Sequence, residues 1–398
     1  MVSGPLHILS GIKIAAFTQF LLGPAAVQYL SDLGADVVKV EQPGTGAWER
    51  TWAGGDTFVN GVSVFFLLAN RNVRSLALNL KSAEGLEVAR KLIAGSDVLV
   101  QNFRPGVMDR LGLGYEEARK INPRLIYASA SGFGEDELTR DMPGQDLLLQ
   151  AFSGLMAITG TAGETPHPAG AAVVDQHGAS LLAMGILAAL MQRGQTGKGQ
   201  KIEVSMLQSA LDLQLEPITY YLNGGALRRP QASLGSTFHQ APYGVYQTAD
   251  GYLAISITAI KALGKALGGV PELEPYEDPD VSLSKREEIF SILAPILRRR
   301  SSQDWLDLLR PQGIWCSAVN DYEQLFADPI IRHLEPILEI DHPIAGPVRV
   351  LKHPVRYSDG EPELRQIPPL VGQHSDEILG ELGYCADQIE RLRAAKVI

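Results

Sequence analysis

One aspartate stands out as a residue whose surroundings suit covalent chemistry. Asp175 ends the segment Pro168-Ala-Gly-Ala-Ala-Val-Val-Asp175, in which small and apolar residues lead into an alanine-rich stretch that is typical of a helix. An aspartate just before a helix usually caps the free backbone N–H groups. It can also act as a nucleophile, because the helix N-terminus favours the ionised carboxylate and a carboxylate needs no partner base. We expect this carboxylate to be ionised at neutral pH, and both interpretations stay open at this point.

Several common catalytic motifs are missing from the chain. No Gly-x-Gly-x-x-Gly follows a predicted strand, no Gly-x-Ser-x-Gly or His-Glu-x-x-His occurs, and residues 194–199 lack the spacing of a phosphate-binding loop. The only two cysteines, Cys316 and Cys385, form no metal-binding pattern. The sequence therefore predicts no metal site, no tightly bound cofactor and a reducing, cytoplasmic location.

The charge distribution indicates the kind of ligand to expect. The 398 residues carry a formal net charge of −10, which argues against nucleic acid as the main partner. Between Arg71 and Arg110, however, there are seven basic residues and four acidic ones. We therefore expect an anionic small ligand on the first half of the chain. The alternative for any single basic residue is an ordinary solvated surface charge.

Strand-like and helical segments alternate in the first half of the chain. Short apolar runs separated by helical patterns predict βαβ units and a parallel sheet that is covered on both faces. The longest apolar run, residues 181–191, is too short to cross a bilayer, so we expect no membrane association. Strands are expected at residues 12–17, 36–41, 75–80, 97–101, 125–129 and 201–206, and helices at 83–94 and 178–192.

The character of the sequence changes in the middle of the chain. Residues 243–247 and 252–257 flank Thr248-Ala-Asp-Gly251, which is a strong hairpin signal. Amphipathic helical patterns follow at 285–299 and 303–309. This section predicts a second, smaller α+β domain. The tail has short strands interrupted by prolines and ends in two predicted helices, at 375–382 and 386–394.

Several short motifs occur one after another along the chain. They are Gly23-Pro24, Leu33-Gly-Ala-Asp-Val-Val-Lys-Val-Glu41, Asn70-Arg71, Leu78-Asn-Leu-Lys81, Val100-Gln-Asn-Phe103, Arg110-Leu-Gly112, Asn122-Pro123, Gly185-Ile-Leu-Ala-Ala-Leu190, Gly197-Lys-Gly-Gln200 and Ala249-Asp-Gly251. In these motifs the chain resembles the family III CoA-transferases over nearly its whole length. That group includes formyl-CoA:oxalate and carnitine CoA-transferases and, as relatives, the α-methylacyl-CoA racemases.

The resemblance implies a fold and an assembly. The fold class is α/β, with a large Rossmann-like, parallel-sheet domain built from both chain ends (residues 1–220 and 328–398). Residues 221–327 would form the small α+β domain and its linkers. Two such protomers are expected to interlock as a homodimer.

The resemblance also implies an activity, the transfer of coenzyme A from an acyl-CoA to a small free carboxylic acid. Asp175 falls on the family's catalytic aspartate, which forms a mixed anhydride and then an aspartyl-CoA thioester. Acyl-CoA is then a substrate and not a resident cofactor. The positions that correspond to the family's contacts with the nucleotide part of CoA, together with a nearby arginine, are Leu78, Asn79, Lys81, Asn102, Phe103 and Arg110.

One departure from the family pattern bears on the type of reaction. The racemases carry a histidine base in a Gly-His-Asp motif, where this chain has Gly144-Gln145-Asp146. Because a glutamine cannot move a proton, CoA transfer is favoured over the alternative of an acyl-CoA racemase or isomerase. A CoA-binding subunit without turnover is the other alternative, and the presence of Asp175 speaks against it. Asp146 is expected either to cap a helix that begins near Leu147 or to tune the charge at the site.

Other departures bear on the substrate. Leu21 replaces a polar active-site residue, and Gln42 stands where a nucleotide-contacting arginine is found. The glycine-rich loop of the formyl-CoA enzymes is not recognisable, so we do not expect a formyl or oxalate substrate. The candidates for lining the substrate pocket are Gln19, Gln145 and His239, and further candidates for recognising the acceptor's polar end are His177 and Arg50.

Overall fold

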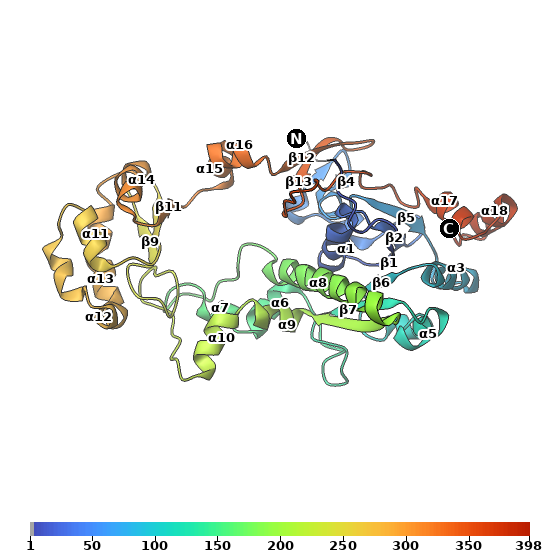
Figure 1. Cartoon of the computed structure of the whole chain (residues 1–398), viewed down its shortest axis with the longest axis horizontal. Helices are drawn as coiled ribbons and strands as arrows, with labels where there is room; N and C mark the ends of the chain where they lie inside the picture. Colours follow the sequence, from blue (N-terminus) through green and yellow to red (C-terminus); the bar gives the residue numbers. More distant parts are fainter. Residues whose placement is uncertain (1–3) are drawn as a thin grey trace. The chain divides into compact units, whose positions relative to one another are not determined.

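The computed structural model describes residues 4–398, and its contacts divide the chain into two compact units (Figure 1). The first unit contains residues 4–149, 172–213 and 336–398, so it is built from both ends of the chain. The second contains residues 150–171 and 214–335. The division expected from the sequence differs, because it places residues 150–171, 214–220 and 328–335 in the large domain. In the structure the Gln150 side chain bonds the backbone of Ala169 (2.8 Å) and Ala171 (3.4 Å), which ties the first of these segments together within the second unit.

A six-stranded parallel sheet forms the centre of the first unit, as predicted. Its order is β5-β2-β1-β6-β7-β8, and every neighbouring pair is parallel. This is the doubly wound order, in which the chain moves outward in one direction, returns to the middle, and then continues in the other direction. The strands are β1 (Lys13–Phe17), β2 (Asp36–Glu41), β5 (Val73–Ala77), β6 (Val98–Gln101), β7 (Ile126–Ser131) and β8 (Gln200–Ser205).

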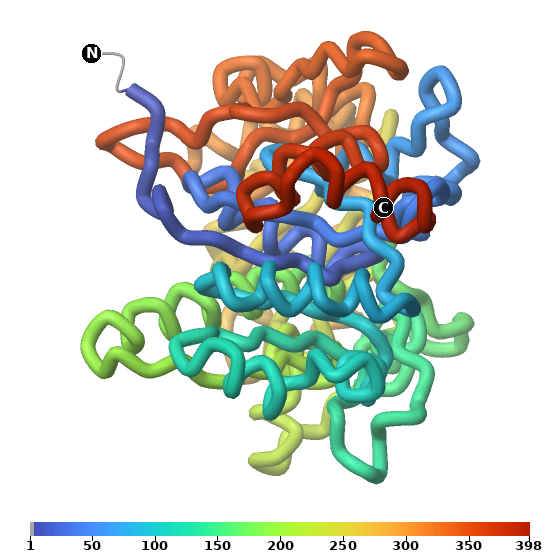
Figure 2. The backbone as a smooth tube through the Cα atoms, turned by 90° about the vertical axis from the view of Figure 1, so that its right-hand side faces the viewer, coloured from blue at the N-terminus to red at the C-terminus, as the bar shows by residue number. Residues whose placement is uncertain are grey.

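Helices cover both faces of this sheet, which explains the near-continuous apolar strands. Along β1, Ile14 and Ala16 belong to one core, which also contains residues of α1 (Leu22–Asp32) and α8 (Val173–Thr196). Ala15 and Phe17 point to the opposite core, because side chains alternate along a strand. Figure 2 shows α3 between α5 and the C-terminal helix pair on this second face. These helices are α3 (Ala83–Ala94), α5 (Tyr115–Ile121), α17 (Ser375–Glu381) and α18 (Ala386–Ala394).

Two predicted elements differ most from the structure in their boundaries. The strand expected at 75–80 begins at Val73 and ends at Ala77, because the chain turns away at Asn79, whose N–H bonds the carbonyl of Val397. The helix expected at 178–192 is longer and spans 24 residues, Val173–Thr196. Its length and apolar composition alone would allow a membrane span, but here it packs on α1, β7, β8 and α9.

The second unit contains the antiparallel sheet β11-β10-β9, formed by Cys316–Ala318, Tyr252–Ile255 and Gly244–Gln247. The predicted hairpin is confirmed, since β9 and β10 pair across residues 248–251. The buried Tyr246 packs with apolar residues of the helices around this sheet. These helices are α11 (Ile260–Ala266), α13 (Arg286–Leu297) and α14 (Ser302–Leu309), and the short helix α12 (Pro279–Ser284) packs on α13.

Short elements connect these layers. Two small antiparallel hairpins lie in the first unit, β3 (Phe58–Val59) with β4 (Val62–Ser63) and β12 (Ile337–His342) with β13 (Gly346–Leu351). The remaining α-helices are α2 (Val64–Leu67), α4 (Val107–Arg110), α6 (Asp146–Phe152), α7 (Leu155–Ile158), α9 (Met206–Asp212), α10 (Leu215–Leu222), α15 (Tyr322–Ala327) and α16 (Pro329–Leu334). Four 3₁₀ turns are described at η1 (Trp48–Arg50), η2 (Gly54–Asp56), η3 (Pro271–Tyr276) and η4 (Arg310–Gln312).

Candidate active site

The carboxyl edge of the parallel sheet gathers most of the residues singled out from the sequence. Parallel strands have all their carboxyl ends at the same edge, and ligands of doubly wound sheets bind there, where the strand order reverses. In this sheet the reversal lies between β1 and β6. Gln19 follows β1, and Asn102 and Phe103 follow β6. The topology therefore brings these three residues to the reversal point.

Asn102 holds the loop that carries Gln19. The Gln19 N–H donates to Oδ1 of Asn102 (2.9 Å), and Nδ2 of Asn102 donates to the Gln19 carbonyl (2.8 Å). Gly23 is required beside them, because a Cβ there would lie 2.9 Å from Cγ of Asn102. Both polar atoms of the Asn102 amide are thus used within the protein. Its side chain positions the loop after β1.

A row of aromatic rings next to this loop was not anticipated from the sequence. Phe20 lies at a φ of 61°, and its N–H donates to the buried Glu49 (3.1 Å). This conformation places the Phe20 ring 4.4 Å from that of Trp48, which stacks on Trp52 at 5.3 Å. Trp52 in turn meets Phe65 edge-on at 4.9 Å. Phe20, Trp48 and Trp52 are exposed, and Phe65 is partly buried. The two tryptophans, four residues apart before β3, were the available signal.

The nucleotide-binding candidates after β5 divide into buried and exposed residues. The Leu78 side chain is buried in the core, so only its backbone is open to a ligand. The Asn79 side chain accepts the Lys81 N–H (3.0 Å) and shapes the turn into α3. The Lys81 side chain is exposed. It therefore remains a candidate for a phosphate contact.

The candidates after β6 follow the same division. Phe103 packs partly against the core, and Arg110 is exposed at the end of α4. Arg104 is also exposed in the same loop, although the sequence analysis did not single it out. Its only sequence signal was its place directly after Asn102-Phe103.

Several cations of the basic segment are committed to internal ion pairs. Arg71 pairs with Asp32 (2.5 Å), and Arg74 pairs with Asp36 (2.8 Å) and two glutamates of α17. Arg50 is also engaged, because two of its nitrogens lie 2.7 Å from the Glu41 carboxylate. Arg50 is therefore part of the scaffold and is not available to recognise an acceptor acid.

Asp175 lies inside helix α8, near its N-terminus. It is the third residue of the helix, so the interpretation of Asp175 as an N-cap is wrong. The helix begins at the carboxyl edge of the sheet, because it must run back across the sheet before β8, which is parallel to β7. Asp175 is partly buried, and its carboxyl group makes no hydrogen bond within residues 4–398.

Asp146 provides the missing cap of α8. Its Oδ1 accepts the N–H groups of Val174 (2.8 Å) and Asp175 (3.1 Å). It is itself the first residue of α6, the helix that was expected to begin near Leu147. The alternative expectation, an effect on the charge of the site, agrees with its position beside Asp175.

The environment of Asp175 alters its acidity. Partial burial, together with the negative charge of Asp146, raises the pKa of Asp175 from 3.8 to about 7. The expectation of a fully ionised carboxylate at neutral pH is therefore wrong. Both the acid and the carboxylate are populated near pH 7. Perturbed carboxyl groups of this kind are concentrated at functional sites.

Two glycines bring Asp146 to this place. The loop 132–145 leaves β7 and returns so closely that a Cβ on Gly132 would lie 2.5 Å from Cα of Gly144. A Cβ on Gly144 would lie 2.3 Å from Cα of Gly132. The close approach fixes the chain directly before Gln145 and Asp146. Gln145 is exposed, next to the capping carboxylate.

The two histidine candidates are placed differently. His177 lies two residues after Asp175, and its Nε2 is 2.7 Å from a carboxylate oxygen of Asp212. His239 belongs to the second unit, where Nδ1 lies 2.7 Å from Ser236 Oγ and the ring stacks on Tyr243 at 4.4 Å. Within residues 4–398, no group of three His, Cys, Asp or Glu residues could hold a metal ion.

Comparison with known proteins yields consistent matches. The family described as CoA-transferase family III matches residues 9–375. Succinyl-CoA:glutarate CoA-transferase of Mus musculus is 36% identical over 400 residues, covering 98% of this chain and 90% of that protein. Formyl-CoA:oxalate CoA-transferase of Rhodopseudomonas palustris is 32% identical, covering 94% of each. A CAIB/BAIF family protein from Brucella suis has a similar structure, with a TM-score of 0.82, 31% identity, and coverage of 96% of this chain and 100% of that one.

Proposed function

Because the chain belongs to CoA-transferase family III, whose members transfer CoA between acyl-CoA and carboxylates, we propose that it does so through covalent intermediates on Asp175. The observation that carries this proposal is the carboxyl group of Asp175. It makes no hydrogen bond within the described chain and has a pKa raised to about 7. A carboxylate of raised pKa is a better nucleophile than an ordinary aspartate once it is ionised.

The proposed reaction passes through three covalent intermediates on Asp175, two anhydrides and one thioester. The Asp175 carboxylate attacks the thioester carbonyl of acyl-CoA, the C–S bond breaks, and CoA leaves as the thiolate. The thiolate then attacks the aspartyl carbonyl of the mixed anhydride and releases the first acid as its carboxylate. The acceptor carboxylate attacks this aspartyl-CoA thioester. The thiolate returns to the acyl carbonyl of the second anhydride, which yields the new acyl-CoA and restores Asp175.

Asp146 favours the covalent states of this cycle. Together with burial, which is the larger cause of the raised pKa, the negative charge of Asp146 raises the free energy of the ionised Asp175 carboxylate. Acylation of Asp175 removes the negative charge, so this repulsion ends in the anhydride and in the thioester. By accepting the N–H groups of Val174 and Asp175, Asp146 also fixes the helix end that carries the nucleophile.

The likeness to enzymes named for succinyl-CoA and glutarate makes dicarboxylic acids the first substrates to test. Other relatives are named for malate, mesaconate, and formate with oxalate. A panel of acyl-CoA donors and mono- and dicarboxylate acceptors, followed by mass spectrometry, identifies the pair that this chain uses. Gln145, exposed where a base would be needed, supports transfer over racemisation at the α-carbon.

The proposed assembly is an interlocked homodimer. Its support in this chain is a stripe of exposed apolar side chains along α15 and α16, at a spacing of four residues. The members are Tyr322, Phe326, Ile330 and Leu334, of which Tyr322 is 81% exposed. Large apolar side chains in such a row commonly mark a surface that another chain covers.

A covalent trap tests the proposed mechanism. Enzyme incubated with acyl-CoA and no acceptor is expected to carry a modified Asp175, which hydroxylamine converts to the hydroxamate and borohydride reduces to the alcohol. Peptide mass spectrometry locates the label. Asp175→Ala is expected to lose transfer and keep its CoA affinity within about threefold, because the carboxylate acts on the thioester and not on the nucleotide.

Asp212→Ala is the matched control, since it removes a carboxylate one helix away that pairs with His177. It should be labelled like the wild type. Label on Asp146, or transfer by Asp175→Ala near the wild-type rate, would overturn the mechanism.

A further inference from the structure

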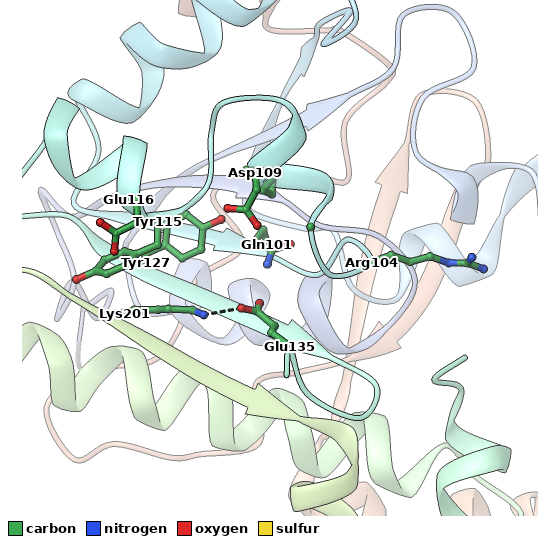
Figure 3. A pocket seen from close by; sticks show the side chains of 10 residues that line it. Gln101, Arg104, Asp109, Tyr115, Glu116, Tyr127, Glu135 and Lys201 are labelled. Atoms are coloured by element: carbon green, nitrogen blue, oxygen red, sulfur yellow. Dashed lines mark hydrogen bonds and ion pairs between the residues drawn. The ribbon is translucent and has the colours of Figure 1, made fainter. Parts of the chain in front are cut away.

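A cavity lies on the second face of the parallel sheet, beneath α4 and α5. Its volume is about 300 Å³, and its lining comes from β6, β7, β8 and the loop after β7 (Figure 3). This volume is at the lower end of the range for small-molecule sites. The mechanism described above uses none of the side chains on the floor of this cavity.

Two largely buried side chains line this cavity with donors that have no protein partner. Gln101 is 4% exposed, and its Oε1 accepts the N–H of Phe103 (2.9 Å), which orients Nε2 away from the backbone. Nε2 has no acceptor within residues 4–398. Tyr127 is 3% exposed, and its hydroxyl also makes no hydrogen bond within these residues. Neither donor atom is enclosed by protein, since both residues line the cavity, so an oxygen of a bound molecule can accept from each of them.

A third polar group is buried on β7, the strand that carries Tyr127. Ser129 is fully buried and its hydroxyl has no hydrogen-bond partner among the described residues. It lies two residues after Tyr127 in β7, so both side chains leave the same face of the sheet. This face of β7 is therefore polar where the neighbouring core is apolar.

Carboxylates surround the two donors. Figure 3 shows the Gln101 amide with Asp109 on one side and the Lys201–Glu135 pair on the other. Glu116 lies beside the Tyr127 ring. Burial, with Glu135 and Asp109 nearby, raises the pKa of Tyr127, so its hydroxyl remains protonated and can donate. Arg104 points away from the centre of the cavity.

The two donors and the carboxylates around them limit which kind of ligand can bind in the cavity. An anion would meet the carboxylates of Asp109 and Glu116, and an ammonium compound could not accept from Nε2 of Gln101. A hydroxyl group can do both, since it accepts from Gln101 or Tyr127 and donates to a carboxylate. The Tyr115 and Tyr127 rings, 5.8 Å apart, add an apolar surface for the C–H groups of such a ligand.

We propose that this cavity is a second ligand site, separate from the acyl-transfer site, which binds a small neutral polyol such as a tetritol or a pentose. The ligand hydroxyls accept from Nε2 of Gln101 and from the Tyr127 hydroxyl, and they donate to Asp109.

Binding to the full chain tests this inference in the absence of CoA. Saturation-transfer NMR with erythritol, D-ribose, ethylammonium and acetate should give signals for the first two only. Tyr127→Phe removes one hydroxyl and Asp109→Asn removes one charged acceptor, so each should weaken ribose binding at least about fivefold. Glu117→Gln, an exposed change on α5 outside this cavity, should bind ribose like the wild type.

Several results would overturn the proposal. They are the absence of polyol binding, equal signals for ethylammonium or acetate, and unchanged ribose binding in both variants. Thermal unfolding of each variant shows whether a loss of binding is a loss of folding. Displacement of ribose by CoA would show that the cavity is part of the CoA site, which also contradicts a separate site. Because the assay needs no turnover, its outcome is independent of the proposed transfer reaction.

Discussion

The two causes of the raised pKa of Asp175 are also the two features that suit it to attack a thioester. Partial burial removes water from the carboxylate, and Asp146 adds negative charge beside it. Both raise the free energy of the ionised group relative to a neutral acid or an acylated product. An aspartate at a helix start usually caps the helix. Here Asp146, which belongs to α6, caps α8.

The titration of Asp175 should appear in the stability of the protein. Its carboxyl titrates near 3.8 when unfolded and near 7 when folded, so between these values the folded chain binds more protons and stability falls as pH rises. Asp175→Asn cannot ionise. It should be more stable than the wild type near pH 8, by on the order of 2 kcal/mol after allowance for partial exposure, and the difference should disappear near pH 4.

Urea unfolding of both proteins at these two pH values measures the effect. Asp212→Asn serves as the control for a carboxylate outside the site. A difference between Asp175→Asn and wild type that does not change with pH would contradict the assigned acidity.

The exposed cations at the carboxyl edge are expected to act on binding and not on chemistry. Lys81→Ala and Arg110→Ala should each raise the KM for acyl-CoA by the equivalent of about 1–3 kcal/mol, with little change in kcat. Contacts to phosphate lie far from the thioester and stabilise the ground state and the transition state alike. Steady-state kinetics at low ionic strength measure this effect, because salt screens exposed charges.

Lys198→Ala is the matched control, since this exposed lysine lies just before β8, at the opposite edge of the sheet. An unchanged KM for both Lys81→Ala and Arg110→Ala would remove these residues from the CoA site. Arg104→Ala extends the comparison to the exposed arginine that only the structure pointed out.

At the scale of elements, the start of α8 is built by contacts between distant segments. The Gly132–Gly144 approach returns the loop after β7 to the sheet edge, and Asp146 then accepts two N–H groups of α8. Leu22 of α1 packs against Gly178, where a Cβ would lie 2.7 Å from it. The nucleophile is thus held by a helix that is fixed at its end and along its side.

Two substitutions of Asp146 separate its charge from its cap. Asp146→Asn keeps an oxygen that can accept both N–H groups and removes the charge. The pKa of Asp175 should then fall, and the rise of kcat/KM with pH should move to lower pH. Asp146→Ala also loses the cap and should lower the free energy of unfolding by about 1 kcal/mol.

Rate profiles against pH for wild type and both variants, with unfolding curves, measure these two effects. The contrary outcome is an Asp146→Asn profile that coincides with the wild type. It would show that the charge of Asp146 does not act on the catalytic carboxylate.

At the scale of the whole molecule, the strand order, the match to CoA-transferase family III and the similar solved structures agree. The family resemblance seen in the sequence is thereby confirmed. The homodimer stays a prediction, which the exposed apolar stripe along α15 and α16 supports. Interlocked protomers could separate only by unfolding or by opening widely.

Sedimentation velocity over a wide concentration range tests the assembly. We expect a dimer at every concentration and no exchange with a differently tagged protomer on mixing of folded proteins. Ile330→Glu, which places a charge in the apolar stripe, should lower the yield of folded dimer, whereas Lys198→Glu should not. A folded monomer in reversible equilibrium with the dimer would contradict interlocking.

The sequence by itself determined the α/β class, the parallel sheet, the hairpin of the second unit and the family. These depend on local patterns and on motifs that survive in linear order. Asp175 was also identified in this way, as the carboxylate that follows a run of small residues into a helix.

Only the tertiary structure decided the surroundings of that carboxylate. Asp146 is 29 residues away in sequence, so neither its hydrogen bonds to α8 nor its effect on the pKa of Asp175 has a local signature. The same holds for Arg50 and Asn102, which looked available to ligands and are bound by Glu41 and Gln19. Residue type and spacing predict which groups can react. Burial and long-range hydrogen-bond partners decide whether these groups are charged and whether they are available to a ligand. Burial and partners both depend on the packing of segments that are distant in the chain.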